Sequence, residues 1–258
     1  MQVISGTPRS TMTPIIQRVS GASMSSSVPS QTIRDLLKPH APFSCAEDEL
    51  RLQSLSSQVE AKQPFELLVM ALDIRKSTML MKEAKRFDLY ASAVGGYIEY
   101  SEKLVRANDG WFDKFTGDGF LAFWLVEENS QQRVIEQVLG LCRQLIDRFD
   151  NHVIDALRSN SRNMPSGVGV GVGMDIGSGH LELFAKDIAV LGSPVVGAVR
   201  MEHLCTKPGD VYCNVSLGQL LRHAQMTFGH NILLHPTHLE TKEYPDGQEA
   251  YKLQWTGI

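Results

Sequence analysis

One apolar segment, residues 65–72, constrains most strongly what this chain can fold into. Its sequence is FELLVMAL, and it is followed directly by Asp73. A compact apolar run of this length is typical of a buried central strand. The residues after Asp73 are Ile-Arg-Lys-Ser-Thr, in which Ser77 is a candidate N-cap for a helix. We therefore expect the folded domain to begin near Pro64 and to place Asp73 at the end of a central strand.

The rest of the chain alternates between helical and strand patterns, without an internal repeat. The expected elements are a helix over 86–106, a hairpin of 111–115 and 120–125 around a Gly-Asp-Gly turn, a helix over 131–158, strands at 168–174, 181–184 and 188–191, a helix over 194–204, a strand at 211–214, a helix from 216, and strands near 232 and 250–254. This order predicts an α/β (α+β) domain with helices packed on a mixed central sheet.

The first 62 residues differ from the rest because they are rich in Ser, Pro, Thr and Gln and lack a sustained apolar period. Such a segment cannot bury enough apolar surface on its own to offset the entropy of ordering it. We therefore divide the chain into an N-terminal arm, 1–62, and a folded domain, 63–258. Within the arm we expect 1–46 to be largely irregular and a short helix over about 46–60.

Composition excludes several classes of function. The formal net charge of −4 does not favour a general nucleic-acid binder or a membrane-surface protein. No run of about 18 apolar residues predicts a transmembrane helix, and the N-terminus lacks the pattern of a signal peptide. The four cysteines have no CxxC spacing, which is typical of free thiols in a reducing, cytoplasmic protein.

Residues 167–173 alternate glycine with valine and superficially resemble a dinucleotide-binding fingerprint. The pattern lies within an expected strand, and no helix follows it, so the required context is missing. We expect these glycines to let a helix pack closely on the sheet.

Asp73 and Asp118 are the strongest candidates for chemistry. One ends a buried strand and the other lies at the tip of the hairpin, so neighbouring strands would bring them together at one sheet edge. Two close carboxylates repel each other unless a cation lies between them, and hard divalent ions prefer such oxygen ligands. The backbone N–H groups near Ser77 and Thr78 suit phosphate. Each feature alone is more often a helix cap or a plain turn, but together they predict a triphosphate–metal site.

Three segments carry a family resemblance: 71–78 (ALDIRKST), 113–119 (DKFTGDG) and 191–200 (LGSPVVGAVR). In this order and spacing they resemble the class III nucleotidyl cyclases, over about Phe65 to Leu253. The resemblance implies a ferredoxin-like cyclase catalytic domain that forms a head-to-tail homodimer with two shared active sites. It also implies that two Mn²⁺ or Mg²⁺ ions per site assist the conversion of a nucleoside triphosphate to a cyclic nucleotide.

The resemblance assigns roles residue by residue. Asp73 and Asp118 match the metal-binding aspartates, and Ile74 matches a residue whose backbone carbonyl also contacts metal. Lys114 matches the base-reading lysine of purine cyclases, and Arg200 matches the arginine that stabilises the transition state. One protomer would supply the two aspartates, and the other would supply Lys114 and Arg200.

Further candidates for substrate binding lie beside the expected phosphate position: Ser77, Thr78, Thr116 and Arg75. Arg75 and its neighbour Lys76 either contact phosphate, close the pocket, or are solvated charges at a helix start. Lys242 is a candidate match to a late triphosphate-binding lysine, although its surroundings fit that match poorly.

Two departures from the family pattern bear on the substrate. Ala189 stands where purine cyclases have a base-reading Asp or Thr, and Val196 stands where they have a ribose-orienting Asn. Losing a hydrogen-bond partner for a buried polar group typically costs about 1–3 kcal/mol. A one-ring base needs less of the purine clamp, so the departures favour a pyrimidine substrate.

The segment 110–119 and the segment 192–200 also resemble the pyrimidine cyclases of bacterial Pycsar anti-phage systems. That resemblance implies that UTP, or else CTP, is cyclised with a preference for Mn²⁺, and that the product activates a separate effector protein. Two alternatives stay open: a purine cyclase, most simply an adenylate cyclase, and an inactive cyclase fold that serves as a dimerising or sensing module. The intact Asp73, Asp118 and Arg200 argue against the inactive module.

Overall fold

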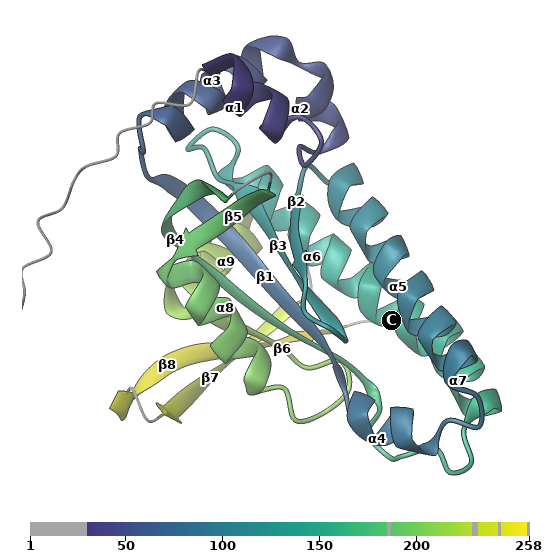
Figure 1. The fold of residues 1–258 in the computed structure, drawn as a ribbon. Coiled ribbons are helices and arrows are strands. Elements are labelled where there is room, and N and C mark those ends of the chain that lie inside the picture. The colour runs from purple at the N-terminus through teal and green to yellow at the C-terminus, as the bar shows by residue number, and fades with distance from the viewer. Residues whose placement is uncertain (1–29, 185–186, 229–231, 242–243, 257–258) are drawn as a thin grey trace, which may run out of the picture.

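The computed structural model describes residues 30–184, 187–228, 232–241 and 244–256. Its core is an eight-stranded mixed sheet with the strand order β2-β3-β1-β4-β6-β8-β7, and β5 pairs with the far end of β4 (Figure 1). The strands are β1 (Phe65–Arg75), β2 (Trp111–Phe115), β3 (Gly119–Leu125), β4 (Gly169–Phe184), β5 (Asp187–Gly192), β6 (Val211–Asn214), β7 (Ile232–Thr241) and β8 (Tyr244–Trp255).

Helices cover both faces of this sheet. After β1 come α4 (Ser77–Glu83) and α5 (Phe87–Ala107), and after β3 come α6 (Gln131–Arg148), the π-turn η1 (Phe149–Val153) and α7 (Ile154–Asn160); α8 (Ser193–His203) and α9 (Val215–Phe228) complete the domain. The predicted order of helices and strands is confirmed, and so is the α/β fold class. The predicted helix over 131–158 is interrupted by η1, and the strands expected at 168–174 and 181–184 form one continuous strand, β4.

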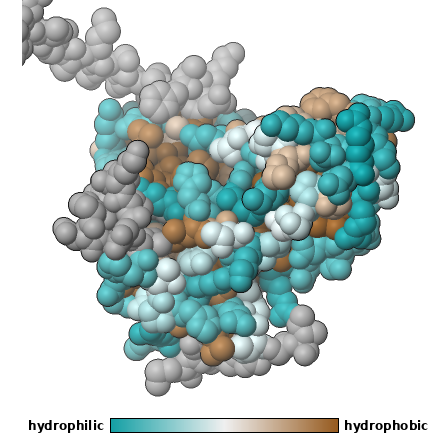
Figure 2. Space-filling model, turned by 90° about the horizontal axis from the view of Figure 1, so that it is seen from below, coloured by the Kyte–Doolittle hydropathy of each residue, from teal (hydrophilic) through white to brown (hydrophobic). Residues whose placement is uncertain are grey.

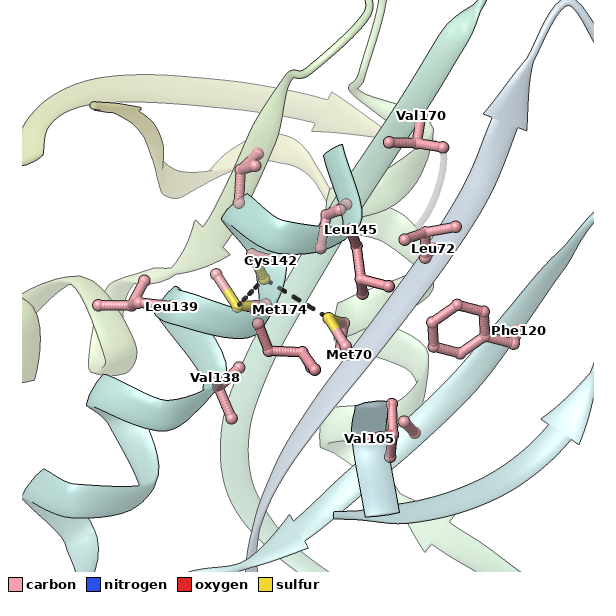
Figure 3. Close-up of a cluster of buried hydrophobic side chains, with 14 of the residues drawn as sticks. Met70, Leu72, Val105, Phe120, Val138, Leu139, Cys142, Leu145, Val170 and Met174 are labelled. Carbon is pink, nitrogen blue, oxygen red and sulfur yellow. Dashed lines mark hydrogen bonds between the residues drawn. The ribbon is translucent and has the colours of Figure 1, made fainter. Parts of the chain in front are cut away.

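Alternate residues of β1 and β4 divide the core into two layers, as expected for strands buried on both faces. On one face, which we call the α5/α6 face, Leu68, Met70, Leu72 and Ile74 pack under α5, α6 and α9. Figure 3 shows this layer, with the Cys142 sulfur 3.5 Å from the Met70 sulfur and 3.8 Å from that of Met174. Burial raises the pKa of the Cys142 thiol to about 12, so this thiol contributes packing rather than reactivity.

The opposite face, which we call the α8 face, lies under α8 and the N-terminal helices (Figure 1). Close packing of α8 depends on Gly171 and Gly173 of β4. A Cβ atom on Gly173 would lie 2.1 Å from both the Ala198 carbonyl oxygen and the Glu202 nitrogen. Gly169, Gly171 and Gly173 therefore belong to a strand, and Gly173 admits α8 onto the sheet, as the sequence predicted, while Gly167 lies in the turn before β4.

The N-terminal arm differs from its prediction. Three helices form between residues 30 and 60: α1 (Ser30–Leu37), α2 (Phe43–Glu47) and α3 (Glu49–Glu60). The expectation of irregular chain up to 46 is therefore wrong for residues 30–37 and 43–46, while the helix expected over 46–60 is close to α3. The apolar residues of these helices are too sparse to form a core alone. They are buried against the sheet, for example Leu37 and Leu52, and tertiary packing of this kind stabilises short helices.

All four cysteines are free, as the sequence predicted, and all four are buried. Among the described residues, no helix combines the length and apolarity needed to cross a membrane.

Candidate active site

Asp73 and Asp118 lie at one edge of the sheet. The pairing of β1 with β3 ends at Asp73 and Gly119, so the residue just before Gly119 stands beside the end of β1. The Ser77 hydroxyl donates a hydrogen bond to the Asp118 carboxylate and fixes the hairpin turn against the start of α4. The structure thus brings together three residues that the sequence singled out separately: Asp73, Ser77 and Asp118.

The start of α4 differs in detail from the prediction. Lys76, with φ of 64°, precedes the helix in a left-handed conformation, and Ser77 is the first helical residue. The predicted N-cap role of Ser77 is therefore wrong, because its hydroxyl is engaged by Asp118 instead of a backbone N–H group. Lys76 is exposed, and Ile74, the candidate carbonyl ligand, follows the last β1–β3 pair.

The Arg75 side chain is largely buried and is bound by other residues of the chain, so it is not a solvated charge. One of its terminal nitrogens donates to both the Asp73 carboxylate and the buried Glu202 carboxylate of α8. Its other terminal nitrogen lies 3.5 Å from the Cys205 carbonyl oxygen. Arg75 and Asp73 both belong to the α8 face of β1, which explains why a residue on α8 reaches them.

The surroundings of Asp73 indicate that a nearby cation would stabilise its ionised carboxylate. Burial raises the pKa of its carboxyl to about 7, Arg75 opposes that rise, and the negative charges of Asp118 and Glu202 add to it. A divalent cation between Asp73 and Asp118 would relieve this repulsion, and both side chains offer the hard oxygen donors that Mg²⁺ and Mn²⁺ prefer. Within the described residues, no group of three or more His, Cys, Asp or Glu could hold a metal. Two carboxylates supply only part of the oxygen ligands that such an ion takes.

A cavity of about 500 Å³ adjoins this edge. Polar residues from the site line one side of it, and apolar residues from α4, α5 and the hairpin line the other. The lining includes Ser77, Thr78, Asp118, Phe87, Tyr90 and Phe115. The end of the molecule that carries α4 is mostly hydrophilic, with isolated hydrophobic patches (Figure 2). The cavity thus offers space for an organic ligand beside a strongly polar end.

Lys114 lies on β2 at an irregularity of the sheet. The register between β2 and β3 shifts between Phe112 and Lys114, which leaves Asp113 as an extra residue. The Lys114 ammonium is 3.2 Å from the Asp113 carboxylate, whose side chain is buried, and the Val190 N–H donates to that carboxylate at 3.4 Å. Lys114 therefore lies beside Asp113, whose carboxylate contacts β5 through the Val190 N–H.

The remaining candidates are spread over other elements. Arg200 lies half-buried on α8, two residues before Glu202, and Val196 is exposed on the same helix. Thr116 is exposed in the hairpin turn, where its N–H donates to the Gly119 carbonyl oxygen at 2.9 Å. Lys242 lies outside the described residues. Within one chain the structure groups Asp73, Asp118, Ser77 and Arg75, and it places Lys114 and Arg200 on β2 and α8.

Known structures share this fold, although no protein-family profile and no curated protein matches the chain. The adenylyl cyclase CyaB from P. aeruginosa is similar with a TM-score of 0.64 and 17% identity, covering 76% of this chain and 97% of that one. The guanylyl cyclase Cya2 is similar with a TM-score of 0.60 and 15% identity, covering 76% of this chain and 95% of that one. This chain has the class III nucleotide cyclase fold.

A third structure with the same fold is the guanylate cyclase domain of RhGC from Catenaria anguillulae in complex with GTP. It has a TM-score of 0.59 and 14% identity, and the match covers 76% of this chain and 100% of that one. The fold implied by the three sequence segments is therefore confirmed. At these identities the similarity concerns the cyclase fold, and the chemistry must be argued from the residues of this chain.

Two residues that contact the candidates were missed by sequence reasoning. Glu202 was missed because it is 127 positions from Arg75, and only the packing of α8 on β1 brings the two together. Asp113 was overlooked although it directly precedes Lys114. Its burial was the missing information, since a charged residue beside a predicted strand end is ordinarily solvated.

Proposed function

We propose that this protein is a nucleotide cyclase that converts a nucleoside triphosphate to its 3′,5′-cyclic monophosphate and pyrophosphate. The observation that carries the proposal is the placement of Asp73 beside Asp118 at one edge of a sheet with the cyclase fold. A fold alone hosts several functions, so this pair of carboxylates is the decisive feature.

The proposed roles follow from residue chemistry. Asp73 and Asp118, with the backbone carbonyl of Ile74, hold two divalent ions, Mn²⁺ or Mg²⁺. When bound, such ions lower the pKa of a hydroxyl and neutralise charge on a triphosphate. Thr78, which lines the cavity beside Asp118, and the exposed Thr116 of the turn are placed to contact the substrate.

Arg200 is the proposed stabiliser of negative charge that builds on the α-phosphate while the ribose 3′-hydroxyl attacks it. A well-placed cation of this kind contributes several powers of ten in rate. We propose a head-to-tail homodimer, as the resemblance to the class III nucleotidyl cyclases implies. Each of its two sites then combines the aspartates of one protomer with Lys114 and Arg200 of the other.

For the base, we propose a pyrimidine, with UTP preferred to CTP. Ala189 offers no side-chain hydrogen bond where a purine clamp requires one, and a missing bond of this kind typically costs about 1–3 kcal/mol. Lys114 donates equally well to a uracil carbonyl and to a ring nitrogen of adenine, so it does not discriminate. The proposed biological role is that of a second-messenger enzyme in anti-phage defence, whose product acts on a separate effector protein in the cytoplasm.

A purine cyclase is the second candidate. It is favoured by a specific observation: solved structures similar to this chain include adenylyl and guanylyl cyclases, one of them in complex with GTP. The two candidates share the metal site and differ only in how the base is held.

Product analysis tests both candidates. The purified full-length protein is incubated separately with ATP, GTP, CTP and UTP in the presence of Mn²⁺, and cyclic products are identified by chromatography and mass spectrometry. We expect cyclic UMP to dominate. Cyclic AMP well above both pyrimidine products would establish the purine candidate, and no cyclic product from any substrate would support the inactive module instead.

A pair of variants ties the product to the site. Asp73→Asn removes a proposed metal ligand and is expected to abolish product formation. Asp155→Asn changes an exposed aspartate on α7 that pairs with Arg158, and it should leave the rate unchanged. Full activity in Asp73→Asn would show that the metal assignment is wrong.

A further inference from the structure

We propose that Arg75 is a built-in counter-ion of the metal site: it holds Asp73 in the metal-free protein, yields that carboxylate to the incoming cation, and remains paired with Glu202. This inference rests on the proposed metal-binding role of Asp73. It assigns a positioning role to Arg75 and Glu202, which carry none in the proposed chemistry.

The geometry of Arg75 is the first support. A single terminal nitrogen is shared between Asp73, on the same strand, and Glu202, on α8. Arg75 therefore engages one of the two oxygens that the Asp73 carboxylate could offer to a metal. A guanidinium and a divalent cation cannot both occupy the same side of that oxygen, so the two compete.

The burial of the group is the second support. The Arg75, Asp73 and Glu202 side chains are 17%, 29% and 6% exposed, so water screens their charges poorly. Without a bound cation, the carboxylates of Asp73 and Glu202, with that of Asp118 nearby, are balanced only by the guanidinium of Arg75. Removing Arg75 from this cluster would leave the buried Glu202 with only the exposed His203, whose Nε2 is 3.7 Å from its carboxylate, and a buried charge without a strong partner is unfavourable.

The incomplete bonding of Arg75 is the third support. Its Nε atom is buried, and it has no hydrogen-bond partner within the part of the chain that the structure describes. Arg75 thus holds Asp73 through one end of the guanidinium only, not through a two-pronged fork. Because Glu202 already accepts from the same nitrogen, Arg75 keeps one carboxylate partner when Asp73 binds a metal instead.

The space that Arg75 occupies is provided by a glycine. Gly171 pairs with Asp73 across β1 and β4, and a Cβ atom there would lie 2.5 Å from the Cys205 Cβ and 3.3 Å from the Arg75 Nε. The side chain is therefore enclosed between β4 and the residue after the end of α8, and it can reach both carboxylates without leaving the site.

Direct measurement of Mn²⁺ binding tests the proposal without turnover. Full-length wild type and variants are titrated with Mn²⁺ alone, and free Mn²⁺ is followed by electron paramagnetic resonance. We expect Arg75→Gln to lower the Kd about tenfold, because the competing cation is gone. Glu202→Gln should raise the Kd about tenfold, because Asp73 becomes the remaining carboxylate partner of Arg75.

The double variant Arg75→Gln/Glu202→Gln decides whether Glu202 acts through Arg75. If it does, Glu202→Gln changes the Kd only when Arg75 is present, and the double variant binds Mn²⁺ like Arg75→Gln. An equal weakening by Glu202→Gln in both backgrounds, or weaker Mn²⁺ binding in Arg75→Gln, would overturn the proposal. The double variant contains no unpaired Glu202 charge, so its comparison with Glu202→Gln stays informative if Arg75→Gln alone fails to fold.

Two controls separate this inference from the proposed function. Arg86→Gln removes an arginine from an exposed ion pair with Asp88 and should leave the Kd unchanged. Asp118→Asn should abolish tight Mn²⁺ binding if the metal site is assigned correctly. If wild type and Asp118→Asn bind Mn²⁺ equally, the metal site of the proposed function fails. If only Arg75→Gln behaves unexpectedly, the counter-ion role alone fails.

Discussion

The two faces of the central sheet are built on different principles, although the same strands supply both. On the α5/α6 face, alternate residues of β1 and β4 are apolar, and Cys142 contacts two methionine sulfurs. On the α8 face, the same strands carry Asp73, Arg75 and Asp175 among glycines, and α8 adds Glu202. The strand residues of the α5/α6 face are apolar, whereas the α8 face holds buried charged residues beside its own apolar cluster.

This difference teaches where stability and chemistry are located. Buried charge costs free energy unless it is paired, so a cluster such as Arg75 with Asp73 and Glu202 is a poor way to stabilise a fold. Positions that break the local rules of packing are frequently functional. We therefore expect changes on the α8 face and at its edge to alter activity and pH response, and changes on the α5/α6 face to alter stability.

The largest expected effect is on activity. Asp118→Asn, at the edge where the two faces meet, should reduce turnover by at least about a thousandfold, because metal-based stabilisation is worth several kcal/mol. Thermal unfolding should change little, because the amide can still accept the hydrogen bond of Ser77. A large loss of melting temperature together with activity would contradict a purely functional role for this residue.

The next effect concerns stability. Phe149 is fully buried on the α5/α6 face, and its ring meets that of Tyr97 edge-to-face at a centroid distance of 5.2 Å. Phe149→Ala should lower the free energy of unfolding by about 3–5 kcal/mol in chemical denaturation. At a temperature where the variant is folded, turnover per folded molecule should match wild type. A selective loss of turnover would break the proposed division between the faces.

The sequence predicted this division only in part. The apolar run of β1 indicated a strand buried on both sides, and Asp73 at its end was predicted to be a metal ligand. The role of Arg75 could not be decided, because a charge next to a helix start is solvated as often as it is bound. Its partner Glu202 depends on how α8 lies across the sheet, which is information that no local pattern contains.

The N-terminal helices show a second limit. Residues 30–60 have a composition that does not predict a stable structure in isolation, and the helices form because Leu37 and Leu52 are buried against the α8 face. Local composition indicates whether a segment is stable as a helix in isolation. These helices are stabilised instead by packing on a surface that residues far along the chain form.

A third, smaller effect concerns pH. Burial raises the pKa of the Asp175 carboxyl to about 7, against a hydrogen bond from the Asn214 amide that lowers it. The folded protein therefore binds this proton more tightly than the unfolded chain, whose carboxyl has a pKa of about 3.9. The contribution of Asp175 to stability is unchanged below about pH 4 and becomes less favourable as pH rises from about 4 through 7.

Asp175→Asn removes this titration and keeps an oxygen that accepts from Asn214, whose amide nitrogen is 2.6 Å from the Asp175 carboxylate. Relative to wild type, the variant should gain stability at pH 8, by at most about 4 kcal/mol for a shift of about three pKa units, and show little gain at pH 4. Denaturant unfolding at several pH values measures this difference. Asp155→Asn, on the exposed surface, should give a constant difference across the same range.

The smallest expected effect concerns the base. Ala189 lies on β5 next to Val190, whose N–H donates to the carboxylate of Asp113, the residue before Lys114. Ala189→Thr adds a hydroxyl without placing a second carboxylate beside Asp113. One new hydrogen bond is worth about 0.5–1.5 kcal/mol, so the ratio of cyclic AMP to cyclic UMP should rise by up to about tenfold. Ala198→Thr is no suitable control, because Ala198 is fully buried; Ala156→Thr, on the exposed surface of α7, is the better one. An unchanged product ratio in Ala189→Thr would mean that selectivity for the base is set elsewhere, and that the missing clamp does not explain a pyrimidine preference.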